Sequence, residues 1–203
     1  MGRSDDRVNS AFKRAVDLIV AVPGVVAICA LAPWIALANR LAGDRGPTFY
    51  SAQRIGEHGR TFQIHKFRTM RPAAGPAITF RGDPRITEVG RFLRRSKLDE
   101  LPQLFNVLRG EMSVVGPRPE SPDYVDWNNP DQRIVLGARP GITGSTQLAY
   151  LREDEALSDD REYRTVVLPR KLALDRWYVE HATARGDLRI ILDTLRAIIF
   201  RSD

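Results

Sequence analysis

Residues 96–120, SKLDELPQLFNVLRGEMSVVGPRPE, carry the most informative local pattern of the chain: two neighbouring carboxylates, Asp99 and Glu100, precede an apolar stripe. Leucine and phenylalanine recur after the acids with the i, i+3, i+4, i+7 spacing of an amphipathic helix that ends near Gly110. A proline is compatible with that helix only in its first turn, where its missing N–H has no partner to lose. Because Pro102 lies just after the acids, the helix is predicted to begin at about Asp99, with both acids at its N-terminus.

This position sets the chemistry expected of the two acids. The helix macrodipole favours anions at the N-terminus, so both carboxylates are expected to have lowered pKa values and to stay ionised at neutral pH. An ionised Asp99 can attack phosphorus, and the adjacent Glu100 can hold a magnesium ion that neutralises phosphate charge. Acids at a helix N-terminus are also common capping residues, and the pair alone fits either role.

Basic residues accompany the acids. Arg118 lies between two prolines, which keep the segment extended and reduce the entropy lost when the side chain binds a phosphate. Lys66 and Arg68 alternate with Phe67 at the end of an expected strand, which predicts two cations close together. The net charge of +6 indicates an anionic partner. A basic cluster is often only a solvated face, but cations around paired acids fit metal-assisted phosphoryl transfer.

Near the N-terminus, residues 18–38 contain no charged side chain and are about long enough to cross a bilayer as a helix. Pro23 and Pro33 interrupt the run, and an interior proline removes a helix hydrogen bond and kinks the axis. Basic residues flank both ends, so the positive-inside rule places both flanks on the cytoplasmic side. We expect residues 1–42 to form a helix that dips into one leaflet, breaks at Pro33 and returns. A kinked spanning helix fits the same residues, and a buried helix of a soluble protein is a third alternative.

The rest of the chain, residues 43–203, is predicted to form one compact α/β domain that is mostly helical, with short strands. Alternation of polar and apolar residues predicts two strands at roughly 48–54 and 60–67. A Pro/Gly-rich segment at 71–84 is expected to be a loop. The chain is expected to end in an amphipathic helix that starts near Asp187 and whose apolar face can lie on a membrane.

Composition argues against several other kinds of site. The single cysteine, Cys29, rules out an internal disulfide or a cysteine-built metal site and fits a reducing compartment. The three histidines lack metal-ligand spacing, so no zinc site is expected. No nucleic-acid recognition motif is present, so nucleic acid is not an expected partner.

Taken together, the motifs resemble the monotopic bacterial phosphoglycosyl transferases, the small bacterial sugar transferase family. The resemblance is carried, in order, by KRAVDLIVA, KFRTM, LDELPQLFNVLRGEMSVVGPRP, RPGITG and LDRWYV, which span residues 13 to 179. It implies an enzyme that moves a sugar-1-phosphate from a UDP-sugar to polyprenol (undecaprenyl) phosphate and releases UMP. The implied route is ping-pong, with a covalent phosphosugar on an aspartate. The implied location is the bacterial inner membrane, with the catalytic domain on the cytoplasmic face.

The resemblance also implies roles for individual residues. Asp99 would be the nucleophile and Glu100 the ligand of Mg²⁺, the expected cofactor. Lys66 and Arg118 match the active-site cations of the family, with Arg118 binding phosphate.

Three further positions follow from the same resemblance. Asp175, in LDRWYV, matches an acidic position near the active site of the family, and Arg139, in RPGITG, is a candidate contact to phosphate or uridine. The family breaks its re-entrant helix at a Ser-Pro pair, whereas this chain has Ala32 and Pro33 there. The serine hydroxyl that would satisfy a freed backbone carbonyl is therefore missing.

Two other functions fit the same residues. A membrane-attached, Mg-dependent phosphohydrolase would use the same acids with water as the acceptor. A non-enzymatic basic module would bind anionic lipid, with strong salt dependence and no release of UMP. The sequence does not identify the sugar, whose specificity is expected to lie in residues 71–84 and 143–165, and it leaves a homodimer possible.

Overall fold

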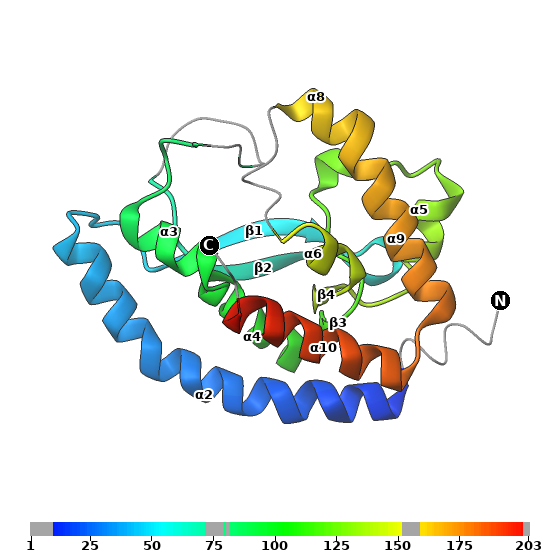
Figure 1. Ribbon diagram of the computed structural model, residues 1–203, viewed down its shortest axis with the longest axis horizontal. Helices are drawn as coiled ribbons and strands as arrows, with labels where there is room; N and C mark the ends of the chain where they lie inside the picture. The colour runs from blue at the N-terminus through cyan, green and yellow to red at the C-terminus, as the bar shows by residue number, and fades with distance from the viewer. Residues whose placement is uncertain (1–9, 72–78, 80–81, 152–158, 201–203) are drawn as a thin grey trace.

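The computed structural model describes residues 10–71, 79, 82–151 and 159–200. A long N-terminal helix, α2 (Ala11–Leu41), is followed by a hairpin of β1 (Phe49–Ile55) and β2 (Thr61–Phe67), and then by further helices and two short strands (Figure 1). These later elements are α3 (Glu88–Arg95), η2 (Leu98–Gln103), α4 (Leu104–Arg109), β3 (Ser113–Val115), η3 (Pro122–Tyr124), α5 (Pro130–Val135), β4 (Gly141–Thr143), α6 (Ser145–Ala149), α8 (Asp160–Glu162), η4 (Tyr163–Val167), α9 (Leu168–His181) and α10 (Ala184–Ile199). The predicted mostly helical architecture with short strands is confirmed.

Two small sheets organise the middle of the chain. β1 and β2 pair antiparallel from Phe49 opposite Phe67 to Ile55 opposite Thr61, close to the predicted bounds. β3 and β4 pair in parallel, with Val115 opposite Thr143. This second sheet places the GPRP segment beside RPGITG: the Gly116 N–H donates to the Thr143 carbonyl (2.9 Å) and the Gly141 N–H to the Pro117 carbonyl (2.8 Å). No local pattern predicted this contact.

The expected break at Pro33 is wrong. α2 runs as one helix through both Pro23 and Pro33 and curves along one side of the domain (Figure 1). Its buried apolar residues recur every seven positions on both sides of Pro33: Ala21, Ile28 and Ile35. Each proline removes only one backbone hydrogen bond, and packing of this stripe on the core holds the helix together.

The opposite face of α2 is apolar and exposed. Its most apolar window has a mean hydropathy of 2.4 with only 17% of the window buried, and among the described residues α2 is the one helix long and apolar enough to cross a membrane. A core helix of a soluble protein would bury most of such a surface. Exposed apolar area on this scale favours association with a membrane.

Polar contacts fix the N-terminal half of α2 to the domain. The spacing of Asp17 from Lys13 and Arg14 predicts an ion pair on one helix face, but that pair does not form. Asp17 is buried, and its Oδ1 accepts hydrogen bonds from the Ser113 hydroxyl and the Val114 N–H, both at 2.8 Å. The two basic side chains instead reach α10 and the end of α4, so Asp17 ties α2 to β3.

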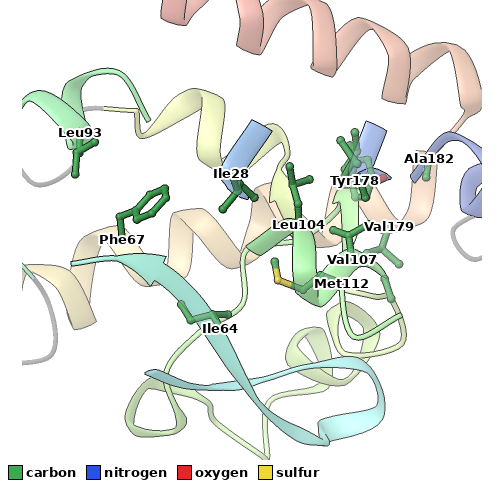
Figure 2. Close-up of a cluster of buried hydrophobic side chains, with 14 of the residues drawn as sticks. Ile28, Ile64, Phe67, Leu93, Leu104, Val107, Met112, Tyr178, Val179 and Ala182 are labelled. Atoms are coloured by element: carbon green, nitrogen blue, oxygen red, sulfur yellow. The ribbon is translucent and has the colours of Figure 1, made fainter. Parts of the chain in front are cut away.

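One hydrophobic core joins α2, both sheets and the later helices. Figure 2 shows part of it, with side chains from α2, β2, α3, α4 and α9 gathered in one cluster. In α10, which is amphipathic as predicted, Ile190 and Ile191 pack on this core while Leu188, Leu192 and Leu195 are exposed.

Parts of two predicted segments lie outside the described residues. In the predicted loop at 71–84 these are residues 72–78 and 80–81, and in the predicted specificity region at 143–165 they are residues 152–158.

Candidate active site

The two acids begin a helical segment, as predicted, but the segment has two parts. A 3₁₀ helix, η2, carries Asp99 and Glu100 in its first turn and passes directly into α4. Lys97, just before η2, has a left-handed backbone (φ 55°), and Gly110 (φ 81°) ends α4 at the predicted position. Short 3₁₀ turns are frequent at helix N-termini, so this difference leaves the acids at the start of the helix.

Asp99 is buried, and one of its carboxylate oxygens has no hydrogen-bond partner among the described residues. Its side chain is 7% exposed, and the oxygen without a described partner is Oδ1. Burial, followed by the negative charge of Glu100, raises the pKa of Asp99 above its ordinary value. The prediction that the helix dipole lowers both pKa values is therefore wrong for Asp99, because the cost of desolvation exceeds the effect of one short helical turn.

Glu100 is held by cations instead. Its Oε1 lies 2.7 Å from Nζ of Lys66 and 4.0 Å from Nη2 of Arg118. Burial acts to raise the pKa of Glu100, but Lys66 and Arg118 outweigh it, so the pKa is lowered and this acid is ionised as predicted. The two adjacent acids thus differ: one is ion-paired and the other is buried without a partner.

Both acids line a cavity of about 280 Å³, together with Lys66 and Arg118. The same cavity is lined by residues of β1, α6 and η4, and Ile64 of β2 lies on its wall. The structure therefore brings together four of the predicted site residues. Arg68 does not join them: it points to the loop after α2 and pairs with Asp44 at 2.6 Å.

Asp175 and Arg139 lie elsewhere. Asp175 is buried behind the cavity wall, where its carboxylate accepts hydrogen bonds from the Arg118 backbone N–H (3.3 Å) and the Thr146 hydroxyl (2.6 Å). Its environment raises its pKa to about 7, chiefly through burial. Arg139 lies 3.5 Å from Glu57 in the β1–β2 turn and is not among the residues that line the cavity. Asp175 therefore contacts the backbone of Arg118 from outside the cavity, and Arg139 is paired with the hairpin turn.

Sequence reasoning missed several polar residues at this site, among them Arg54 and Thr146. Arg54, on β1, lines the cavity. Thr146, on α6, donates a hydrogen bond from its hydroxyl to the Asp175 carboxylate. The strand register carried a signal for Arg54, because side chains on one face of a hairpin alternate. Thr146 had no such signal, since its partner is distant in the sequence.

The acids also suit a magnesium ion shared with substrate. Within the described residues, no cluster of three metal-ligating side chains is found. Mg²⁺ in phosphoryl-transfer sites is commonly held by one or two carboxylates together with substrate phosphates, and Asp99 and Glu100 can supply these. The unpartnered Oδ1 of Asp99 fits such a site.

These features match a known protein family. A profile of the bacterial sugar transferase family matches residues 8–201, and the chain belongs to that family. The family predicted from the motifs is thereby confirmed.

Several relatives are similar over nearly the whole chain. An undecaprenyl-phosphate galactose phosphotransferase of Salmonella typhimurium is 34% identical over 96% of this chain, which spans 42% of that relative. A UDP-glucose:undecaprenyl-phosphate glucose-1-phosphate transferase of Caulobacter vibrioides is 39% identical over 92% of this chain and 69% of its own length. The exopolysaccharide production protein ExoY of Sinorhizobium fredii is 36% identical, with 94% and 87% covered. The chain thus spans less than half of the Salmonella protein but most of ExoY.

Proposed function

We propose that this protein transfers a sugar-1-phosphate from a UDP-sugar to polyprenol phosphate and releases UMP. The observation that carries the proposal is the buried carboxylate of Asp99, whose Oδ1 has no partner among the described residues, in a cavity next to a glutamate that is held by two cations. The names of the Salmonella and Caulobacter relatives describe transfer of this kind to undecaprenyl phosphate, which supports the same reaction here.

The first step uses Asp99 as the nucleophile. One of its carboxylate oxygens forms a bond to the sugar-bearing phosphorus of the donor. The bond from that phosphorus to the bridging oxygen breaks, and its electron pair leaves on the phosphate of UMP. Lys66 and Arg118 offset the repulsion between the carboxylate and the donor phosphates.

The second step returns the enzyme to its starting state. A phosphate oxygen of polyprenol phosphate attacks the phosphorus of the phosphosugar, and the Asp99 carboxylate departs. A covalent intermediate lets a soluble donor and a lipid acceptor use one carboxylate in turn. Mg²⁺, held by Glu100 together with the donor phosphates, would neutralise phosphate charge.

Packing of α2 supports a location on one side of the membrane. Its buried stripe meets the domain from Ala21 to Ile35, so α2 lies along the domain instead of extending away from it. We infer that α2 enters one leaflet with its exposed apolar face and does not cross. The domain then lies on the cytoplasmic face of a bacterial inner membrane, where UDP-sugars are available.

The test is the release of UMP from purified protein in nanodiscs with a UDP-sugar and magnesium. The wild type is expected to release about one UMP per active site before acceptor is added, with the phosphosugar attached to Asp99, and chelation with EDTA is expected to abolish release. Asp99→Asn is expected to release none. Asp123→Asn, which changes an exposed acid outside the cavity, is the matched control and is expected to behave as the wild type.

The rival functions give different results. Continuous release of UMP without acceptor would identify water as the acceptor and would contradict the transferase. Full activity of Asp99→Asn would refute its role as the nucleophile. Strong binding to anionic lipid with no UMP release for any UDP-sugar would indicate a basic lipid-binding module.

A further inference from the structure

A second arginine lies along the same face of the hairpin as the active-site lysine. Arg54 is opposite Phe62, and Lys66 is opposite Tyr50. Directly opposed residues of an antiparallel pair point to the same side, so Arg54 and Lys66 share one face, four positions apart, or about 13 Å along the strands. Both line the cavity, as does Ile64, which lies between them in the register.

Three cations that line the cavity, Lys66, Arg118 and Arg54, differ in their partners. Lys66 is ion-paired to Glu100, and Arg118 lies 4.0 Å from the same carboxylate. In the described part of the chain, the only hydrogen bond from the Arg54 side chain goes to the backbone oxygen of Gln53 (2.8 Å), and no carboxylate is within ion-pair distance. Arg54 therefore brings a positive charge to the cavity that no described side chain pairs with directly.

Charges on neighbouring elements also act on Arg54. Burial and the positive charge of Arg118 lower its pKa, while Glu120 acts in the opposite direction. Glu120 already accepts a hydrogen bond from the Tyr163 hydroxyl (2.9 Å). Two guanidinium groups that repel each other at the wall of a cavity are stabilised by an anion bound between them.

We propose that Arg54 binds the donor phosphate that leaves as UMP. This inference rests on the proposed transferase function and assigns the Arg54 end of the cavity to the nucleotide phosphate of the donor. Lys66 and Glu100 lie at the Asp99 end, where the transferred phosphorus must be. In-line displacement places the leaving oxygen on the side of phosphorus away from the nucleophile. Arg118 lies 4.0 Å from Glu100 and lines the same cavity as Arg54. A planar guanidinium suits the charge that develops on the departing phosphate.

A ping-pong route makes this assignment measurable. Donor and acceptor react in separate half-reactions, so kcat/KM for each substrate reports on its own step. A residue that binds the nucleotide phosphate affects the donor step, whereas a residue that binds the acceptor phosphate affects the second step.

The experiment compares Arg54→Gln, Arg54→Lys and Arg60→Gln. Arg60 is an exposed arginine that follows the turn of the same hairpin and does not line the cavity, so it is the matched control. For Arg54→Gln, kcat/KM for the donor is expected to fall by about 10- to 100-fold, the range for loss of a charge-assisted phosphate contact. Transfer from a preformed phosphosugar enzyme to polyprenol phosphate is expected to keep its rate. Arg54→Lys is expected to lie between, and Arg60→Gln to match the wild type.

A binding measurement separates this inference from the transfer route. UDP, which has both phosphates but lacks the transferred sugar, is titrated into Asp99→Asn protein with and without Arg54→Gln. The double variant is expected to bind UDP about 10- to 100-fold more weakly, whether or not Asp99 is the nucleophile. Unchanged UDP affinity, or a loss confined to the acceptor step, in a variant with the melting temperature of the wild type would overturn the assignment. If UDP affinity falls while the wild type releases no UMP without acceptor, the two-step route fails and the Arg54 assignment stands.

Discussion

Replacement of Asp175 by asparagine tests the electrostatics behind the cavity wall. Burial raises the pKa of Asp175 from 3.8 to about 7, which corresponds to about 4 kcal/mol, since one pKa unit is 1.36 kcal/mol. The folded protein holds this proton more tightly than the unfolded chain does. The free energy of unfolding therefore falls as pH rises from about 4 to about 7, and the loss is complete above pH 7.

Asp175→Asn removes that pH dependence, because an amide does not titrate. Its amide oxygen can still accept from the Arg118 N–H, and its amide N–H can donate to the Thr146 hydroxyl, which can turn its own proton to the Lys171 carbonyl (3.3 Å). This rearrangement is expected to cost at most about 1 kcal/mol, independent of pH. The difference in unfolding free energy between variant and wild type is expected to shift by about 3 kcal/mol in favour of the variant between pH 5 and pH 8. For a chain of 203 residues this is about 6–12 °C in relative melting temperature.

The assay is thermal unfolding in nanodiscs at both pH values, with Asp123→Asn as the control. Subtracting the wild-type curve cancels the titration of groups common to both proteins. If the melting-temperature difference between Asp175→Asn and the wild type is equal at pH 5 and pH 8, the pKa of Asp175 is not raised. The conclusion that burial outweighs the hydrogen bonds in setting this pKa would then be wrong.

Two further changes test how the helices are held. Lys13→Met removes the ion-pair partner of the partly buried Asp187, which lies 2.6 Å from Lys13, and is expected to cost about 3 kcal/mol of stability. Asp187→Asn is expected to cost much less in the Lys13→Met protein than in the wild type. Additive losses in this double-mutant cycle would contradict the coupling. Gly90→Ala places a Cβ against the backbone carbonyl of Thr69 and is expected to cost about 1–3 kcal/mol, measured by thermal unfolding. A rise in the melting temperature of Gly90→Ala would show that α3 can move away from this contact.

Local sequence predicted the elements that depend on near neighbours. Pro102 and the apolar spacing placed Asp99 and Glu100 at a helix start, and Gly110 at its end, because these signals act within one or two turns. The hairpin bounds followed from alternation, which is also a local property. The break expected at Pro33 failed because the packing that carries α2 through it comes from the rest of the domain.

The positions of the candidate site residues were predicted less completely than the helices and strands. The resemblance selected Lys66 and Arg118, which do meet at Glu100, but it also selected Arg139, which turns to Glu57. Motif membership does not show which way a side chain points.

The sequence by itself determined that two acids start a helix, that an apolar segment precedes them, and that the chain carries the motifs of the bacterial sugar transferases. The folded structure adds that Asp99 is buried with an Oδ1 that has no described partner while Glu100 is ion-paired, that Asp175 accepts from the Arg118 N–H, and that Arg54 shares a face with Lys66. The physical reason is that burial and charge pairing depend on groups far apart in the chain. Their contributions to the pKa and to binding exist only once the strands, α2 and α9 have packed together.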